Sequence, residues 1–485
     1  MSFSRETIAK SFLWKLFERF SVQIIQFVVT IVLARLIVPS EYGIISLIAI
    51  FIQLCEVIIE GGLNTALVQK KDADNKDFST IFFFSIAVSF LLYWVMFFAA
   101  NPIARFYSQP TLVPVIRILS INLLFYAINS VQRAYVSKHM LFGKLFYSSL
   151  AAVILSGIIG ITMAYKGYGV YALVAQAISN QLFTTIVMAF TVKWRPDPVF
   201  SGERFKPLFN YGWKIFGASF ITTLFVNARK LVIGKFFQPA NLAYYEKGDQ
   251  FPGLVMNNIF TSMQAILLPT FSEEQDDRAR IKSMMRRSTK ISCLVIYPLL
   301  MGLIVVAEPL VSFLLKDNWL PAVPFIRILC ISYFFRPITI SNWEAIKAMG
   351  YSDITLKLEI LKKVIDIVIL IVSVFFGVYA IAWGCVLYNF ICLFINLWPN
   401  IKLLGYTIKE QFLDAVPTLL ISLAMGASIY WIHLLPMSDL AILSCQILLG
   451  AIVYIAICYL TKEESFMYLL TLLKDNYNRI LFKRG

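Results

Sequence analysis

Long apolar stretches recur along the whole chain, and short polar segments separate them. Because a helix needs about 20 mostly apolar residues to cross the hydrocarbon core of a bilayer, this pattern predicts about fourteen membrane-spanning helices. The predicted fold class is an all-α polytopic membrane protein. The spans are expected near residues 14–34, 43–69, 79–100, 113–132, 148–164, 169–192, 210–233, 248–271, 291–312, 323–345, 358–376, 378–398, 413–431 and 441–460.

Two of these stretches depart from a simple span. The second is longer than a crossing requires and contains Gly61 and Gly62, which predict a bend. The eleventh is short of apolar residues, and its helix is expected to begin outside the hydrocarbon core with Lys357, Lys362 and Lys363.

The composition excludes an ordinary soluble protein. Of the 485 residues, 59% are hydrophobic and only 15% are charged, and the mean hydropathy is +0.75. Soluble domains carry about 25% charged residues. No loop is long enough to form a domain, and the motifs GxxxxGK(S/T), HExxH and GxSxG are absent. We therefore expect a protein that acts within the membrane and is not an enzyme.

The formal charge of +15 is explained by topology. Basic residues concentrate on alternate loops, and the positive-inside rule then places both termini in the cytoplasm. No nucleic-acid partner is expected. The seven cysteines lie in apolar stretches without metal-ligand spacing, and the two histidines, His139 and His433, fall on opposite sides of the membrane. We predict no metal and no bound cofactor.

The two halves of the chain resemble each other in three places, in the same order and at a nearly constant offset. The pairs are Val113–Ile121 with Val323–Ile331, Gly169–Ala172 with Gly377–Ala380, and Ala34–Pro39 with Gly234–Pro239. The repeat predicts an N-terminal lobe of six spans (1–200), a C-terminal lobe of six spans (201–400), and two added spans with a cytoplasmic tail (401–485). Parallel repeats are typical of transporters that hold their substrate between two lobes and work by alternating access.

Polar side chains inside four of the spans recur at steps of three and four residues, so each set shares one helix face. The sets are Lys15, Arg19, Gln23, Gln26 and Thr30; Gln53, Glu56, Glu60 and Asn64; Ser219, Thr223, Asn227 and Lys230; and Gln250, Gly253, Asn257, Thr261 and Gln264. One interpretation is a hydrophilic cavity at the lobe interface. The alternative is that these residues form hydrogen bonds between helices.

Cations on these faces suit a phosphate or diphosphate, because arginine binds it through two parallel hydrogen bonds and lysine as a point charge. The candidate substrate-binding residues are Lys15, Arg19, Gln26, Asn227, Arg229, Lys230, Asn257 and Arg336. An alternative for Arg229 and Lys230 is that they extend to the membrane surface. The candidate ion-coupling or charge-balancing residues are Glu18, Glu56, Glu60 and Asp249, which suit H⁺ or Na⁺.

Several short segments, taken in order, resemble one family. They are Leu33–Leu36 with Pro39–Gly43, Gly61–Gly62 before Asn64, Leu242–Tyr245, Leu268–Asp277, and Asn318–Trp319 before Val323–Cys330. With these the chain resembles the Wzx-type polysaccharide flippases, colanic-acid-exporter-like subgroup. That group belongs to the MOP exporter superfamily, which also contains the MurJ lipid II flippase and the MATE drug antiporters.

This resemblance implies a flippase that moves undecaprenyl-diphosphate-linked oligosaccharide across the bacterial inner membrane for surface polysaccharide synthesis. It also implies a cavity with cations for the diphosphate, which we assign to Arg19, Arg229 and Lys230; Glu56 and Glu60 depart from a purely cationic cavity. The expected partners are the lipid-linked oligosaccharide, membrane lipids and glycan-assembly proteins. Two alternatives stay open: a cation-coupled antiporter of small cationic amphiphiles, and a scaffold for glycan-assembly enzymes that transports nothing.

Overall fold

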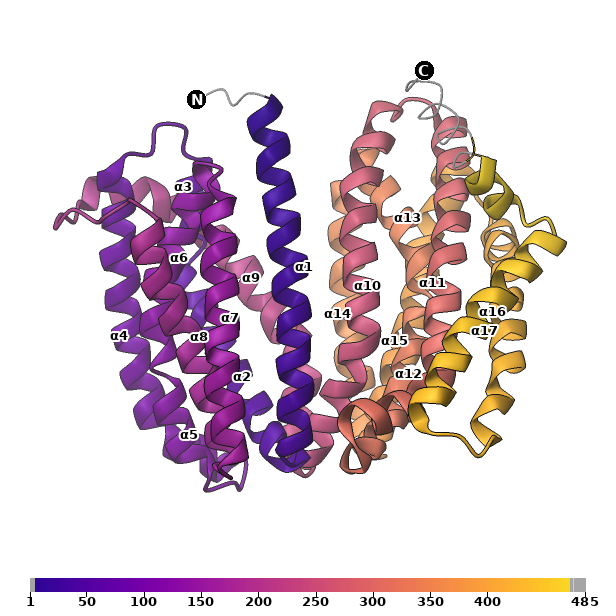
Figure 1. Cartoon of the computed structure of the whole chain (residues 1–485). Coiled ribbons are helices and arrows are strands. Elements are labelled where there is room, and N and C mark those ends of the chain that lie inside the picture. The colour runs from indigo at the N-terminus through magenta and orange to yellow at the C-terminus, as the bar shows by residue number, and fades with distance from the viewer. Residues whose placement is uncertain (1–4, 472–473, 475–485) are drawn as a thin grey trace, which may run out of the picture. The chain divides into compact units, whose positions relative to one another are not determined.

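The computed structural model describes residues 5–471 and 474, and every regular element in this part of the chain is a helix (Figure 1). The α-helices are α1 (Arg5–Leu36), α2 (Pro39–Glu60), α3 (Leu63–Gln69), α4 (Asn75–Phe106), α5 (Leu112–Leu119), α6 (Asn122–Lys138), α7 (Phe142–Tyr165), α8 (Val170–Thr191), α9 (Gly202–Phe236), α10 (Pro239–Glu273), α11 (Arg278–Leu315), α12 (Val323–Tyr333), α13 (Arg336–Ala348), α14 (Ser352–Val374), α15 (Val378–Leu404), α16 (Ile408–Tyr430) and α17 (Asp439–Leu460). Two short 3-10 helices, η1 (Asp317–Ala322) and η2 (Trp431–Leu434), precede α12 and follow α16.

Thirteen segments of the described chain are long and apolar enough to cross a membrane, and each matches one predicted span. The remaining predicted span, the eleventh, forms α14, which is 23 residues long but carries Lys357, Lys362 and Lys363 in its first half. The predicted all-α membrane fold is therefore confirmed. Three of the predicted spans are each built from two α-helices: α2 with α3, α5 with α6, and α12 with α13.

The internal repeat is visible in where the helices begin. α2 and α10 follow the first helix of each half, and both begin with a proline, Pro39 and Pro239. Proline is favoured there because its fixed φ suits the first turn and its missing N–H has no partner to lose. α8 and α15 each begin directly after a glycine of positive φ, Gly169 at 54° and Gly377 at 99°. Similar local sequences thus start a new helix at corresponding places in both halves.

The predicted bend at Gly61 and Gly62 is confirmed. Their φ angles of 51° and 69° end α2 and start α3, and only glycine adopts this region without strain. Gly62 has a second constraint, because a Cβ atom there would lie 2.2 Å from the carbonyl oxygen of Gly212 in α9. The backbone of the α2–α3 junction therefore rests directly on the backbone of α9.

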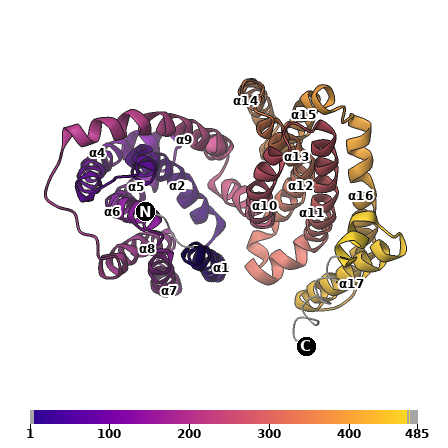
Figure 2. The same ribbon diagram turned by 90° about the horizontal axis from the view of Figure 1, so that it is seen from above.

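The chain contacts divide the protein into two compact units, residues 1–243 and residues 244–485. In the first unit α7 packs between α1 and α8, and α9 runs along α2 and α3 (Figure 2). A core of apolar side chains, including Leu67, Phe78 and Trp194, joins α3, α4 and the segment after α8. The unit thus buries apolar residues from helices far apart in the sequence.

Polar contacts fix the start of α4 in this unit. Asp74 and Asp77 form a capping box, and Lys70 donates to both carboxylate oxygens of Asp77 at 2.9 and 2.7 Å. Arg204 of α9 lies 3.3 Å from Asp74. Burial alone would raise the pKa of Asp74, but the Asp77 backbone N–H and the Arg204 charge lower it overall.

In the second unit α11 is the central helix. It packs against α12, α13, α16 and α17, and Figure 2 shows α16 and α17 on the side of α11 away from α14. The start of α16 is held to α11 by ion pairs. Lys282 binds Glu410 at 2.9 Å, and Arg286 binds both oxygens of Asp414 at 2.8 and 2.9 Å. Tyr406 also donates to Asp414 at 2.8 Å.

The two units and the two predicted lobes have different boundaries. The sequence repeat begins again at α9, whereas α9 packs on α2 and α3 of the first unit. The repeat is defined by similar sequences and the compact units by contacts, so their boundaries need not coincide. The lobe boundaries stay a prediction from the repeat.

Candidate functional site

A cluster of polar side chains joins α2 and α6 in the first unit. The hydroxyl of Tyr126 donates to the Glu60 carboxylate at 2.6 Å. Glu56, one turn earlier on α2, interacts electrostatically with Glu60 and with Arg133 of α6. All four side chains are half-buried. The two candidate acids of the predicted stripe on α2 therefore lie together.

Arg133 and Tyr126 are site residues that the sequence analysis missed. Both lie on one face of α6, two turns apart, and a stripe search that included tyrosine would have found them. Among the described residues, none forms a hydrogen bond with the Arg133 guanidinium, and no carboxylate lies within 4.0 Å of it. A half-buried arginine with uncommitted donors is unusual inside a membrane segment, where ionised groups are usually paired.

The predicted polar face of α1 is divided between packing and exposure. Glu18 is half-buried and accepts a hydrogen bond from Ser149 of α7 at 3.2 Å. Lys15 and Arg19 are exposed, and the Lys15 ammonium lies 5.1 Å from the centre of the Phe142 ring. Gln26 is half-buried. Lys15 and Glu18 thus both contact α7, at Phe142 and at Ser149.

On α9 the structure places Asn227 in a packing position. Its side-chain amide is buried and donates to Gln53 of α2 at 3.2 Å and to the Thr223 carbonyl at 2.9 Å. For Asn227, this contact therefore supports the alternative interpretation of the stripe, in which polar residues form hydrogen bonds between helices. Arg229 and Lys230 are half-buried and each interacts with neighbouring groups.

The second unit contains a related cluster on α10, α12 and α13. Tyr333 donates to Asp249 at 2.9 Å, and the Arg336 guanidinium lies 4.6 Å from the centre of the Tyr333 ring. Arg336 also lies 5.8 Å from the ring of Phe260. Asn257, one of the candidate residues on α10, is exposed. Asp249 and Arg336 are therefore brought to one place through Tyr333.

A second polar network in this unit includes Gln264 of the predicted stripe on α10, while its other members were not predicted. Glu344 of α13 is fully buried and accepts from Lys347 at 2.7 Å and from Gln264 of α10 at 3.1 Å. Next to it on α13, the buried Asn342 donates to Gln411 at 2.7 Å. The bond from Gln264 joins α10 to α13, and the bond from Asn342 joins α13 to α16. The network therefore holds these three helices together. The spacing of Glu344 and Lys347 is the signal that would have indicated it.

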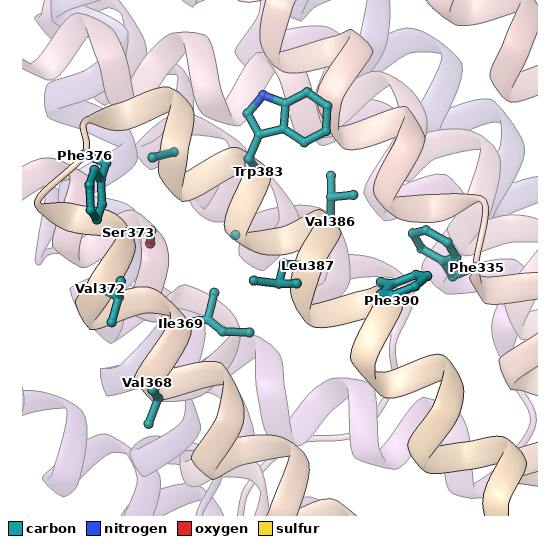
Figure 3. Close-up of a pocket in the computed structure, with 12 residues that line it drawn as sticks. Phe335, Val368, Ile369, Val372, Ser373, Phe376, Trp383, Val386, Leu387 and Phe390 are labelled. Atoms are coloured by element: carbon teal, nitrogen blue, oxygen red, sulfur yellow. The ribbon is translucent and has the colours of Figure 1, made fainter.

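One cavity of the second unit is apolar and separate from these clusters. It has a volume of about 770 Å³ and lies between α14 and α15, where Leu387 extends toward Ile369 and Phe390 lies beside Phe335 (Figure 3). Ser373 contributes its only hydroxyl group. Such a groove offers nothing to a charged headgroup and suits hydrocarbon chains. Within the described residues, no group of three or more histidine, cysteine, aspartate and glutamate side chains is arranged to hold a metal.

Many apolar helices, an internal repeat and polar faces on corresponding helices define a multi-spanning membrane transporter fold. A solved structure with this fold is the lipid II flippase MurJ in an inward closed conformation, with a TM-score of 0.71 and 17% identity. The alignment covers 92% of this chain and 97% of that one. The likeness establishes the fold.

Sequence relatives narrow the class. The teichuronic acid biosynthesis protein TuaB of Bacillus subtilis (strain 168) is 24% identical over 87% of this chain and 88% of its own length. The succinoglycan biosynthesis transport protein ExoT of Rhizobium meliloti (strain 1021) is 22% identical over 67% of this chain and 66% of its own length. Residues 32–324 match the model of a family described as polysaccharide biosynthesis protein. The chain belongs to this family, which confirms the predicted resemblance to membrane proteins of polysaccharide biosynthesis.

Proposed function

We propose that this protein is a flippase that moves undecaprenyl-diphosphate-linked oligosaccharide repeat units across the bacterial cytoplasmic membrane by alternating access. The family, the names of the relatives and the lipid II flippase fold support this substrate class. The glycan units would then serve surface polysaccharide synthesis. The charge pattern of the loops supports an orientation with both termini in the cytoplasm.

The observation that carries the proposal is the uncommitted Arg133 guanidinium inside a membrane segment. Its planar donors match the oxygens of a diphosphate, and an anionic ligand would supply the partner that the described residues do not. Arg19 adds a second arginine, which is exposed and lies in the first half of α1. By the proposed topology both arginines lie in the cytoplasmic half of the first unit. That is the leaflet in which the lipid-linked substrate is made.

The acids beside Arg133 have a proposed role as well. Glu56 and Glu60 are two carboxyl groups beside one arginine, so one proton or one Na⁺ would balance the cluster without substrate. Binding of the diphosphate and binding of the cation would then be coupled through Arg133. We propose the same type of coupling, with a single acid, for Asp249 in the second unit.

A leaflet assay tests the function directly. The purified protein is placed in liposomes that hold undecaprenyl-diphosphate oligosaccharide labelled on one side, and label on the other side is measured over time. We expect transfer by the wild type and by Arg105→Ala, which removes an exposed arginine at the end of α4. Arg133→Ala and Arg19→Ala should lose transfer while they remain folded. Equal transfer by Arg133→Ala and Arg105→Ala would contradict the diphosphate site.

One observation favours a second candidate function. The carboxylate pair Glu56 and Glu60 also suits a cationic substrate, as in a cation-coupled antiporter of small amphiphiles. The same liposomes, loaded with a cationic dye and given a proton or Na⁺ gradient, distinguish the two. Dye exchange that Glu60→Gln abolishes, together with no movement of the glycolipid, would replace the flippase proposal.

A further inference from the structure

A second charged cavity lies in the second unit, away from the clusters described above. It has a volume of about 530 Å³ and lies between α11 and the segment that follows α17. From α11 it is lined by Arg286, Arg287 and Lys290, which recur at steps of one and three residues and share one face. Glu464 and Tyr468 line the opposite wall. The cavity is therefore a cationic groove closed by one short segment.

The charges of this cavity do not cancel. Arg286 is held by the bidentate pair with Asp414, and Lys290 pairs with Glu464 and lies 3.6 Å from Asp414. Two cations therefore face two acids. Arg287 is the third cation, and no carboxylate of the described chain forms an ion pair with it. The cavity thus carries about one uncompensated positive charge.

Arg287 is positioned by an aromatic ring. Its guanidinium lies 3.7 Å from the centre of the Tyr468 ring. A cation over a ring face is attracted by the π electrons, and this contact uses the face of the guanidinium rather than its N–H groups. The donors around its edge remain available for an anion, and a phosphate takes two of them in parallel.

The cavity lies at the depth of a lipid headgroup. α11 is basic from Arg278 to Lys290 and apolar from Ile291 onward, so the cavity marks where the helix enters the hydrocarbon core. One turn further, Leu294 and Val295 open an apolar groove of about 670 Å³ whose other wall includes Ile455 of α17. The same two regions of the chain therefore form a cationic site followed by an apolar one.

We propose that this cavity binds the phosphodiester headgroup of an anionic phospholipid, with Arg287 as the principal contact. One phosphodiester charge neutralises the surplus of one, and an acyl chain follows the apolar groove along α11 and α17. The basic side of the membrane segment is the cytoplasmic one by the positive-inside rule, and that leaflet is rich in anionic lipid. The bound lipid would hold the segment after α17 against α11. The site is distinct from the Arg133 cluster and does not depend on the transported substrate.

Native mass spectrometry of the full-length protein measures this binding. The protein is released from nanodiscs that hold equal amounts of phosphatidylglycerol and phosphatidylcholine, and the retained lipid is identified. We expect retention of phosphatidylglycerol in preference to phosphatidylcholine. Arg287→Gln should lower its occupancy about fivefold, the effect of one basic residue at a membrane surface. Arg287→Lys, which keeps the charge but not the planar donors, should lower it less.

A matched control lies on the same helix. Arg280 is exposed, pairs with Glu274 and does not line the cavity, so Arg280→Gln should retain phosphatidylglycerol as the wild type does. Equal retention by Arg287→Gln and Arg280→Gln would overturn the proposal. Two competition arms identify the source of the phosphate. Displacement by millimolar inorganic phosphate would assign the cavity to a free ion, and preferential retention of undecaprenyl phosphate would assign it to the transported lipid class; either result rejects the phospholipid.

Discussion

The two units contain similar polar clusters whose arginines have different surroundings. Each contains an acid, a tyrosine and an arginine on corresponding helices, and in each the tyrosine hydroxyl donates to the acid: Tyr126 to Glu60 and Tyr333 to Asp249. The arginines differ. Arg133 is two turns from Tyr126 on one continuous helix and interacts with it electrostatically, whereas Arg336 is three residues from Tyr333 across the break between α12 and α13 and lies over its ring.

The break between α12 and α13 therefore decides what the arginine can do. In the second unit the Arg336 guanidinium lies over the Tyr333 and Phe260 rings, and one acid accompanies one cation. In the first unit two acids, Glu56 and Glu60, accompany Arg133. We propose on this basis that the first unit captures the substrate and that Arg336 of the second unit is mainly structural.

The strongest test of this difference removes each arginine in turn. Arg133→Ala should lower glycolipid transfer about 100-fold, because two charge-assisted hydrogen bonds of about 1.5 kcal/mol each are lost. Arg336→Ala should lower it only about threefold through loss of packing. Initial rates in the leaflet assay measure both. If the two variants lose transfer equally, the distinction between the units is wrong.

The acids provide a second and smaller test. Glu60→Gln should slow transfer about tenfold, as expected for loss of roughly 1.5 kcal/mol in a charged hydrogen bond, and should remove the dependence on a proton or Na⁺ gradient. Asp249→Asn should retain part of that dependence, since the first unit still carries its acid pair. Rates are compared with and without an ionophore. An unchanged gradient dependence in Glu60→Gln would reject the coupling role.

Removal of the tyrosine hydroxyls should affect stability by similar amounts in both units. Tyr126→Phe and Tyr333→Phe each delete one donor to a carboxylate, which we expect to lower the free energy of unfolding by about 1.5 kcal/mol. Thermal unfolding in detergent reports the change. Because Tyr333→Phe keeps the aromatic ring beneath Arg336, only Tyr126→Phe is expected to slow transfer as well. A loss of transfer in both would show that the second cluster also contacts substrate.

The smallest effect concerns the stacked arginine. Arg336→Lys keeps the charge over Tyr333 and gives up planar stacking, and should lower the free energy of unfolding by about 0.5 kcal/mol. Arg133→Lys should leave stability unchanged but reduce transfer, because it replaces a bidentate donor with a point charge. The two lysine variants thus separate a packing role from a binding role in the same pair of measurements.

Hydropathy predicted the spans well because a bilayer imposes one length on every crossing. The junction at Gly61 and Gly62 was also predictable, since adjacent glycines readily adopt the positive φ that ends a helix. The division of the fourth and tenth spans was not, because the apolar pattern continues through both breaks. Arg133 was missed for a related reason. The predicted span ended at residue 132, while α6 continues to Lys138, so the arginine was assigned to a loop.

The candidate site was partly predictable. Periodicity identified Glu56, Glu60 and Asp249, since a charged residue within a span stands out from its neighbours. It did not separate residues that line a cavity from residues that join helices, because both occupy the inner face of a helix. Asn227, which bonds to Gln53, shows the difficulty. The role of each candidate residue in binding substrate or ions stays a prediction.

The direct contact between the Gly62 and Gly212 backbones has a consequence for dividing the protein into two separately expressed fragments. A cut near residue 200, where the sequence repeat restarts, would leave α9 on the wrong fragment and expose the backbone surface on which it rests. A cut after Phe237, between α9 and α10, keeps that surface covered. The N-terminal repeat therefore needs α9, the first helix of the C-terminal repeat, to cover the backbone at the α2–α3 junction.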